Sequence, residues 1–137
     1  MTENLPTRGQ LERTLSQRLL AFYRQQIGQQ PSKVTCQFFA EKLAIILEDS
    51  ITPAEQVLAQ EGKKDLAEQV RNGLDEATRP LLKSLIEETI GIEVVDLLSD
   101  ATLDTGRTGI IAIFETSPAV RNPESLGTTR SRDRSAR

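Results

Sequence analysis

The apolar residues of the chain follow two different periods, which predict helices and strands in a definite order. Over residues 9–27 they recur at helical spacing, so we expect an amphipathic helix with an apolar side formed by Leu11, Leu15, Leu19 and Phe22. Over residues 34–39 the period changes to two, which predicts a strand. After a turn at residues 40–42, the apolar run 43–47 predicts a second, more buried strand that forms an antiparallel hairpin with the first.

A helical block of about forty residues follows. Its start is marked by Thr52 and Glu55, whose side chains can cap each other's backbone amides, with Pro53 at the first helical position. After Gly62, apolar residues step by three and four along one stripe, made of Leu66, Val70, Leu74, Ala77, Leu81 and Leu85. Pro80 interrupts this helix, either as a kink or as the start of a new helix capped by Thr78 or Arg79. The apolar stripe keeps the same helical spacing before and after Pro80, which favours one kinked helix over two separate helices.

Two further strands are predicted, over residues 92–98 and 110–114, joined by the turn residues 104–107. The second of these strands is a run of apolar residues with high strand preference, so we expect it inside the sheet or under a helix. The element order is αββααββ. It predicts an α+β fold with two layers, in which helices pack on a mostly antiparallel four-stranded sheet.

The length of 137 residues suits one domain, which we place at residues 8–116. Residues 1–7 lack periodicity, and residues 117–137 are rich in Ser, Thr, Pro and Arg, so both ends are predicted to be disordered. The single cysteine, the polar start of the chain and the absence of an apolar run of about 20 residues predict a cytoplasmic protein without a transmembrane segment.

Several classes of catalytic and ligand-binding site can be excluded from the residues present. The chain has no histidine, which excludes His-based triads, and Cys36 lies among apolar neighbours in a predicted strand, as a packing residue does. The adjacent carboxylates Asp75-Glu76 and Glu87-Glu88 diverge on a helix, and no calcium loop, phosphate loop or dinucleotide motif is present. We therefore predict no catalytic residues, no metal, no cofactor and no enzymatic activity; a pocket gathering Asp, Glu, Arg, Ser or Thr side chains would revive an enzyme hypothesis.

Surface contacts are the remaining candidates. Arg79, beside Pro80, can bind a carboxylate or phosphate with its planar fork, or form a salt bridge to Asp75 or Glu76 one turn back. Leu82 and Ile86 lie off the main stripe, and this surplus apolar surface predicts a homo-oligomer, most simply a dimer. Arg107 belongs either to a plain hairpin turn or to a binding loop. The tail can contact nucleic acid or an anionic surface, or remain solvated, through Arg130, Arg132, Arg134 and Arg137.

Four short segments together resemble a known family: residues 51–56 (ITPAEQ), 77–80 (ATRP) with Ile86-Glu87, 91–95 (GIEVV), and Ser99-Asp100 followed by residues 105–107 (TGR). In order and spacing they are similar to the small bacterial MpsC-like domain family, over about residues 10–116. The family's name reflects a sodium-translocating, membrane-potential-generating system linked to inorganic-carbon uptake.

The resemblance implies an association with a membrane ion or inorganic-carbon transport system. Together with the lack of convergent reactive groups and the surplus apolar surface, it predicts a non-catalytic accessory or regulatory protein that acts through protein contacts, peripheral to the inner membrane, with an unidentified protein partner. It carries no catalytic or ligand residue over to this chain. Gly28-Gln29-Gln30-Pro31 stands where members tend to have a second glycine and a basic residue. The alternative function is binding of nucleic acid or an anionic surface through the arginine-rich tail.

Overall fold

The computed structural model describes residues 4–121, and the predicted element order αββααββ is confirmed in them. The helices and strands are α1 (Arg8–Gln26), β1 (Lys33–Phe39), β2 (Lys42–Glu48), α2 (Pro53–Gln60), α3 (Lys64–Ile90), β3 (Val94–Thr102) and β4 (Arg107–Phe114). The predicted capped start of α2 is confirmed. The Thr52 hydroxyl accepts a hydrogen bond from the Glu55 amide at 3.2 Å, and the Glu55 carboxylate accepts one from the Thr52 amide at 3.1 Å.

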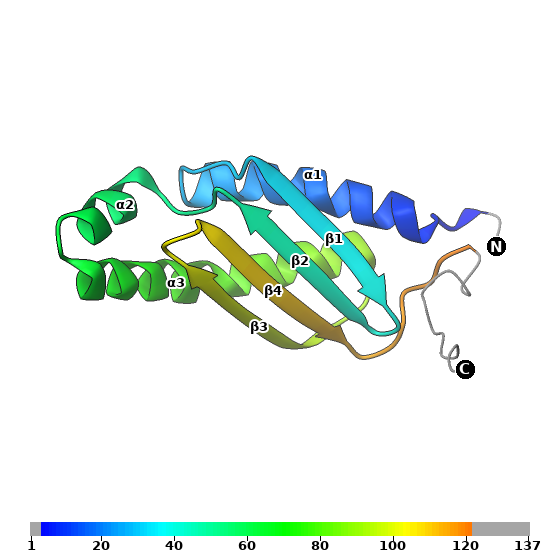
Figure 1. The fold of residues 1–137 in the computed structure, drawn as a ribbon. Helices are drawn as coiled ribbons and strands as arrows, with labels where there is room; N and C mark the ends of the chain where they lie inside the picture. Colours follow the sequence, from blue (N-terminus) through cyan, green and yellow to red (C-terminus); the bar gives the residue numbers. More distant parts are fainter. Residues whose placement is uncertain (1–3, 122–137) are drawn as a thin grey trace, which may run out of the picture.

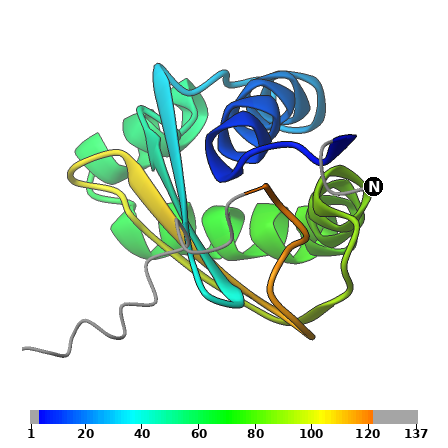
Figure 2. The same ribbon diagram turned by 90° about the vertical axis from the view of Figure 1, so that its right-hand side faces the viewer.

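The four strands form one antiparallel sheet in the order β1-β2-β4-β3. The apolar strand β4 is therefore central, as its sequence requires, and β1 and β3 are the edges. Figure 1 shows α1 and α3 behind this sheet, and Figure 2, turned by 90°, shows both long helices on the same side of it. The fold is the predicted α+β arrangement of two layers, and no helix of residues 4–121 covers the other face of the sheet.

The core lies between the helices and the inner face of the sheet. Alternate strand residues point inward, so Cys36 and Phe38 of β1 are buried while Gln37 and Phe39 are exposed. The Phe38 and Phe114 rings lie 6.0 Å apart at the centre. From the helices the core takes Leu11, Leu15, Leu19, Phe22, Tyr23, Leu82, Ile86 and Ile90.

Helix α3 runs without a break through Pro80, so the alternative of a new helix starting there is wrong. Its buried face also differs from the expected stripe: Leu66 and Leu81 are 45% and 49% exposed, whereas Leu82 and Ile86 are 5% and 0% exposed. The stripe that faces the sheet lies one residue further along the chain. Two neighbouring stripes of this helix carry apolar residues. The sheet packs against the stripe that contains Leu82 and Ile86, and the stripe that contains Leu66 and Leu81 is more exposed.

The folded part extends beyond residue 116, where we predicted that it ends. Pro118 and Val120 are buried, and Val120 belongs to the core. The Arg121 amide donates to the Pro6 carbonyl at 3.0 Å, and Thr7 caps α1. The buried side chains of Pro118 and Val120 are enough to anchor this otherwise polar segment to the domain. The rest of the predicted tail, residues 122–137, lies outside the described residues.

Helix side chains cover backbone groups at both sheet edges. On β1, the Phe38 amide donates to the Glu12 carboxylate at 2.8 Å. On β3, the Val94 amide donates to the Glu87 carboxylate at 2.8 Å, and Arg79 donates to the Leu97 carbonyl at 2.6 Å. Edge strands with satisfied outward groups are poor templates for an added strand. At these three positions the edge groups are already engaged and cannot pair with an added strand.

Candidate functional site

A buried ion pair connects α2 to α3. Glu55 is fully buried and Arg71 is 5% exposed, and the Arg71 fork reaches both carboxylate oxygens of Glu55 at 2.7 Å, through Nε and Nη2. The same Glu55 oxygen that meets Nη2 also accepts the Thr52 hydroxyl at 2.7 Å. Such bidentate geometry is the strongest form of this contact. Glu55, which the sequence predicted to cap the start of α2, is therefore also the anionic member of a buried ion pair.

The Arg71 guanidinium reaches two further elements. Its Nη2 donates to the Ser50 carbonyl at 3.2 Å, and its Nη1 contacts the Asp75 carboxylate at 3.3 Å. The Ser50 side chain in turn meets the Thr108 hydroxyl at 2.7 Å and donates to the Gly106 carbonyl at 3.0 Å. This cluster ties the β2–α2 connection, α3 and the start of β4 together. Its hydrogen-bonding groups are committed to one another, which is the pattern of a structural network.

The electrostatics of the cluster follow from its burial. Burial raises the pKa of Asp75, the Arg71 charge acts in the opposite direction, and Glu55 raises it again. Burial first, and the Asp75 charge second, also raise the pKa of the Tyr23 phenol, which keeps that phenol protonated.

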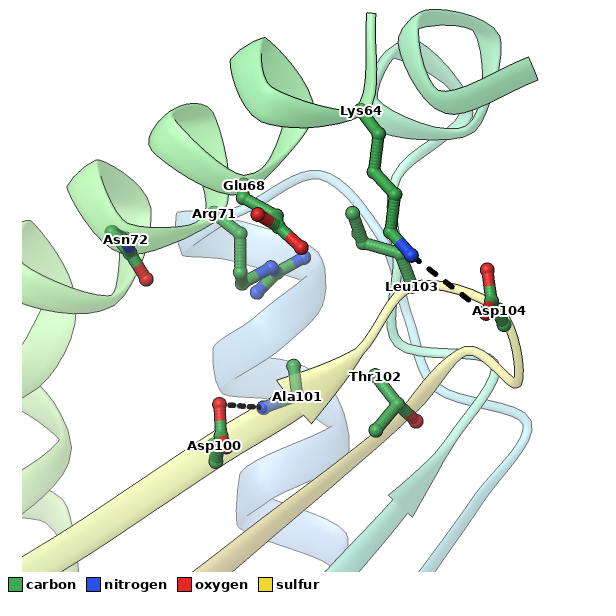
Figure 3. Close-up of a pocket in the computed structure, with 9 residues that line it drawn as sticks. All are labelled: Lys64, Glu68, Arg71, Asn72, Asp100, Ala101, Thr102, Leu103 and Asp104. Carbon is green, nitrogen blue, oxygen red and sulfur yellow. Dashed lines mark hydrogen bonds and ion pairs between the residues drawn. The ribbon is translucent and has the colours of Figure 1, made fainter. Parts of the chain in front are cut away.

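A depression of about 370 Å³ lies beside this cluster, between the first turns of α3 and the end of β3. Figure 3 shows Lys64, Glu68 and Arg71 descending from the helix towards the strand and the turn. Lys64 reaches Asp104 at 3.9 Å across its outer edge. The lining mixes both signs of charge, and its best placed cation, Arg71, is already engaged by Glu55. Within residues 4–121, no group of three or more Asp, Glu or Cys side chains is arranged to hold a metal ion.

The residues predicted from the sequence at Arg79 and Pro80 line a second depression, which we call the Pro80 groove. It has a volume of about 400 Å³ and is formed by one face of α3 and the first half of β3, with lining residues Arg79, Pro80, Lys83, Val94, Val95, Asp96 and Leu97. Val95, at a bulge of the edge strand, is 57% exposed. Its lining combines apolar side chains with the charged residues Arg79, Lys83 and Asp96.

Arg79 does not form the expected salt bridge to Asp75 or Glu76 among the described contacts. Its Nη1 donates to the Leu97 carbonyl, and its Nη2 donates to the Ser99 hydroxyl at 3.3 Å. The edge strand offers a carbonyl within reach of the long side chain, a partner that sequence spacing along the helix does not reveal. The guanidinium therefore positions β3 against α3 through two of its nitrogens.

The other predicted site residues lie in different parts of the molecule and do not form one site. Leu82 and Ile86 were expected at a partner surface, but they lie in the core and cannot contact a partner. Arg107 begins β4 after the confirmed hairpin turn, where Gly106 has φ 76°, and pairs with Glu48 at 2.8 Å. Arg130, Arg132, Arg134 and Arg137 lie outside the described residues.

Sequence reasoning missed Arg71, the most connected polar residue of the described chain. The only local signal was its place on the stripe that includes Ala67, where a charge interrupts small and apolar residues. Cys36 lies where expected: burial raises the pKa of its thiol to about 11, and the Ser16 hydroxyl contacts its sulfur at 3.4 Å. It is a packing residue.

A family model described as "Na+-translocating membrane potential-generating system (MpsC)" matches residues 7–116. This match confirms the resemblance inferred from the short segments. Comparisons with curated proteins and with solved structures found no match. None of the helices within residues 4–121 has the length and apolar character needed to cross a bilayer.

Proposed function

Because the chain belongs to the MpsC family, whose description names a sodium-translocating, membrane-potential-generating system, we propose that it serves such a system as a non-catalytic accessory or regulatory protein. It acts through protein contacts, from the aqueous side of the membrane. Its partner is a membrane subunit of that system.

The observation that carries this proposal is the Pro80 groove. Val95 stands exposed at the bulge of β3, and the lining also includes Pro80 and Lys83 from α3 and Asp96 from β3. A depression lined by both apolar and charged side chains has the composition of a protein contact site. Because Arg79 and Glu87 engage the Leu97 carbonyl and the Val94 amide, strand addition is disfavoured along this part of β3, and the proposed recognition is through side chains.

The non-catalytic part of the proposal is supported by how the reactive groups are used. Arg71 and Glu55 neutralise each other in the interior, and Cys36 is protonated and buried. The chain contains no histidine to act as a base near neutral pH. The charges that line the depression of Figure 3 belong partly to this internal network.

Capture from detergent-solubilised native membranes tests the proposal. The wild-type chain should retain sodium-translocating membrane subunits, identified by mass spectrometry. Val95→Asp should lower their recovery about tenfold or more, since it loses buried apolar area and introduces a desolvated charge. Val57→Asp is the matched control, because Val57 on α2 is 55% exposed against 57% for Val95.

The outcomes separate cleanly. Absence of these subunits from the wild-type capture refutes the proposed function. Equal recovery by Val95→Asp and the wild type refutes the assignment of the groove. Equal losses in Val95→Asp and Val57→Asp would show that any added surface charge disturbs the complex, which also removes the groove from the argument.

A further inference from the structure

The sheet face opposite the helices carries an apolar patch of its own. The strand registers place its outward side chains in four rows across β1, β2, β4 and β3. The first row is Lys33, Glu48, Arg107 and Thr102; the second is Thr35, Ile46, Gly109 and Asp100; the third is Gln37, Ala44, Ile111 and Leu98; the fourth is Phe39, Lys42, Ile113 and Asp96. Apolar residues therefore form a continuous band through the middle of the face.

This band is exposed to a degree that is unusual for strand residues of this kind. Leu98 is 52%, Phe39 42% and Ile46 40% exposed. Charged residues stand around the band, at the ends of β2 and β4 and along β3. A contiguous apolar surface with a polar rim marks a contact site. Helix side chains engage the Phe38 and Val94 amides and the Leu97 carbonyl at the two edges, which disfavours strand addition at those points and favours contact across the face.

We propose that a second copy of this chain packs on this face, sheet against sheet, about a two-fold axis parallel to the strands. The four central positions are two large residues, Ile46 and Ile111, and two small ones, Ala44 and Gly109, placed diagonally. The proposed axis lays β2 over the partner's β4 in the same rows. Ile46 then lies over the partner's Gly109, and Ile111 over the partner's Ala44. Large residues meet small ones at every central position, as close sheet packing requires.

The charges at one end of the patch fit the same axis. Glu48 and Arg107 of one copy form a pair at 2.8 Å, and the two-fold operation brings Glu48 over the partner's Arg107. The four groups alternate in sign and form a network between the copies. Aligned sheets are rotated by about 30° from each other, which carries the four corner residues Lys33, Phe39, Thr102 and Asp96 towards solvent. The central positions and this charged row are thus complementary to themselves, as a two-fold interface requires, while the same axis lays Ile113 over the partner's Lys42 and Leu98 over the partner's Gln37.

The available area is sufficient for a specific dimer of modest affinity. Four strands spaced about 4.8 Å apart, over about 25 Å of strand, cover roughly 500 Å² on each copy, or about 1,000 Å² in total. This value is at the lower limit for specific interfaces. The Pro80 groove lies at the outer edge of β3, so self-association leaves it open to a different partner.

Sedimentation velocity of the full chain over a concentration series tests this inference. The wild type should sediment as a dimer, and Ile46→Lys should raise its dissociation constant about a hundredfold, because a lysine charge replaces a central contact. Val57→Lys, on α2 and 55% exposed against 40% for Ile46, should leave the dimer intact. Circular dichroism and thermal melts establish that each variant is folded.

Gly109→Ala tests the arrangement itself. Within one copy, the added methyl meets only the Ile46 Cδ1 atom at an ordinary 3.7 Å, so the fold tolerates it. Between copies it fills the space over which the partner's Ile46 lies, and should weaken the dimer about tenfold. A monomeric wild type, an unaffected Ile46→Lys dimer, or equal dissociation by Val57→Lys would overturn the inference. Retained capture of membrane subunits by such a monomer would leave the proposed function standing.

Discussion

Replacing Arg71 by methionine is the sharpest test of how this fold is held together. The substitution keeps most of the side-chain volume and removes the guanidinium. Glu55, which is fully buried, then keeps only the Thr52 amide and hydroxyl as donors. The Ser50 carbonyl loses the Arg71 donor at 3.2 Å.

The expected cost follows from burial. Breaking a buried ion pair by removing one partner costs about 3–5 kcal/mol, because the remaining charge stays desolvated. That is a third or more of the roughly 5–15 kcal/mol by which a domain of this kind is stable. With about 4 °C per kcal/mol for a domain of this length, the melting temperature should fall by about 12–20 °C.

The assay is urea unfolding of wild type and variant, followed by circular dichroism. Arg107→Met is the matched control: Arg107 and Glu48 form a pair at 2.8 Å, but their side chains are 59% and 33% exposed. Solvent screens that pair, so its loss should cost only about 0.2–1 kcal/mol. The two ion pairs have similar distances but different burial. A larger loss of stability in Arg71→Met than in Arg107→Met would therefore identify desolvation of the remaining charge as the cause.

The double variant Arg71→Met with Glu55→Gln separates charge burial from lost packing. Neutralising the orphaned carboxylate should make the double variant about 1–2 kcal/mol more stable than Arg71→Met alone. A cost below about 1 kcal/mol for Arg71→Met, or a double variant less stable than the single one, would refute the reasoning.

Three further predictions concern single residues. Pro80→Ala should raise the free energy of unfolding by about 2 kcal/mol in urea titrations, because it restores a helical donor to the Glu76 carbonyl. Cys36, whose thiol pKa burial raises to about 11, should react with iodoacetamide at mildly alkaline pH about a hundredfold more slowly in the native chain than in the unfolded one. Burial raises the pKa of Asp75, so its ionisation opposes folding; Asp75→Asn should therefore gain stability relative to the wild type as the pH rises from acid to neutral, measured by urea titration at both ends. Native Cys36 reacting at the unfolded rate, or a reversed pH trend for Asp75→Asn, would contradict these assignments.

Local signals in the sequence were sufficient for the order of the elements and for several of their ends. The reciprocal Thr52 and Glu55 cap spans three residues, and the turn before β4 needs a positive φ that Gly106 supplies. Strand alternation assigned Cys36 and Phe38 to the core, and the apolar character of β4 assigned it to the middle of the sheet. Each of these features depends on neighbours only a few residues away.

The candidate site was predicted only in part. Arg79 and Pro80 do line a groove, but Val95, its most exposed apolar member, comes from a strand that sequence spacing could not place beside them. The partner of Arg79 is a carbonyl 18 residues further on. The apolar band on the sheet face was not anticipated, because a strand pattern alone does not say which face a helix layer will cover.

The sequence by itself determined the period of each segment, its caps and turns, and the family to which the chain belongs, since these follow from short-range spacing. Tertiary structure alone decided which of two adjacent apolar stripes of α3 faces the sheet, and therefore that Leu82 and Ile86 are core while Leu81 is exposed. It also paired Glu55 with Arg71, 16 residues away, because burial of one charge requires another within reach. Both decisions depend on how the layers pack, and no local pattern encodes that choice.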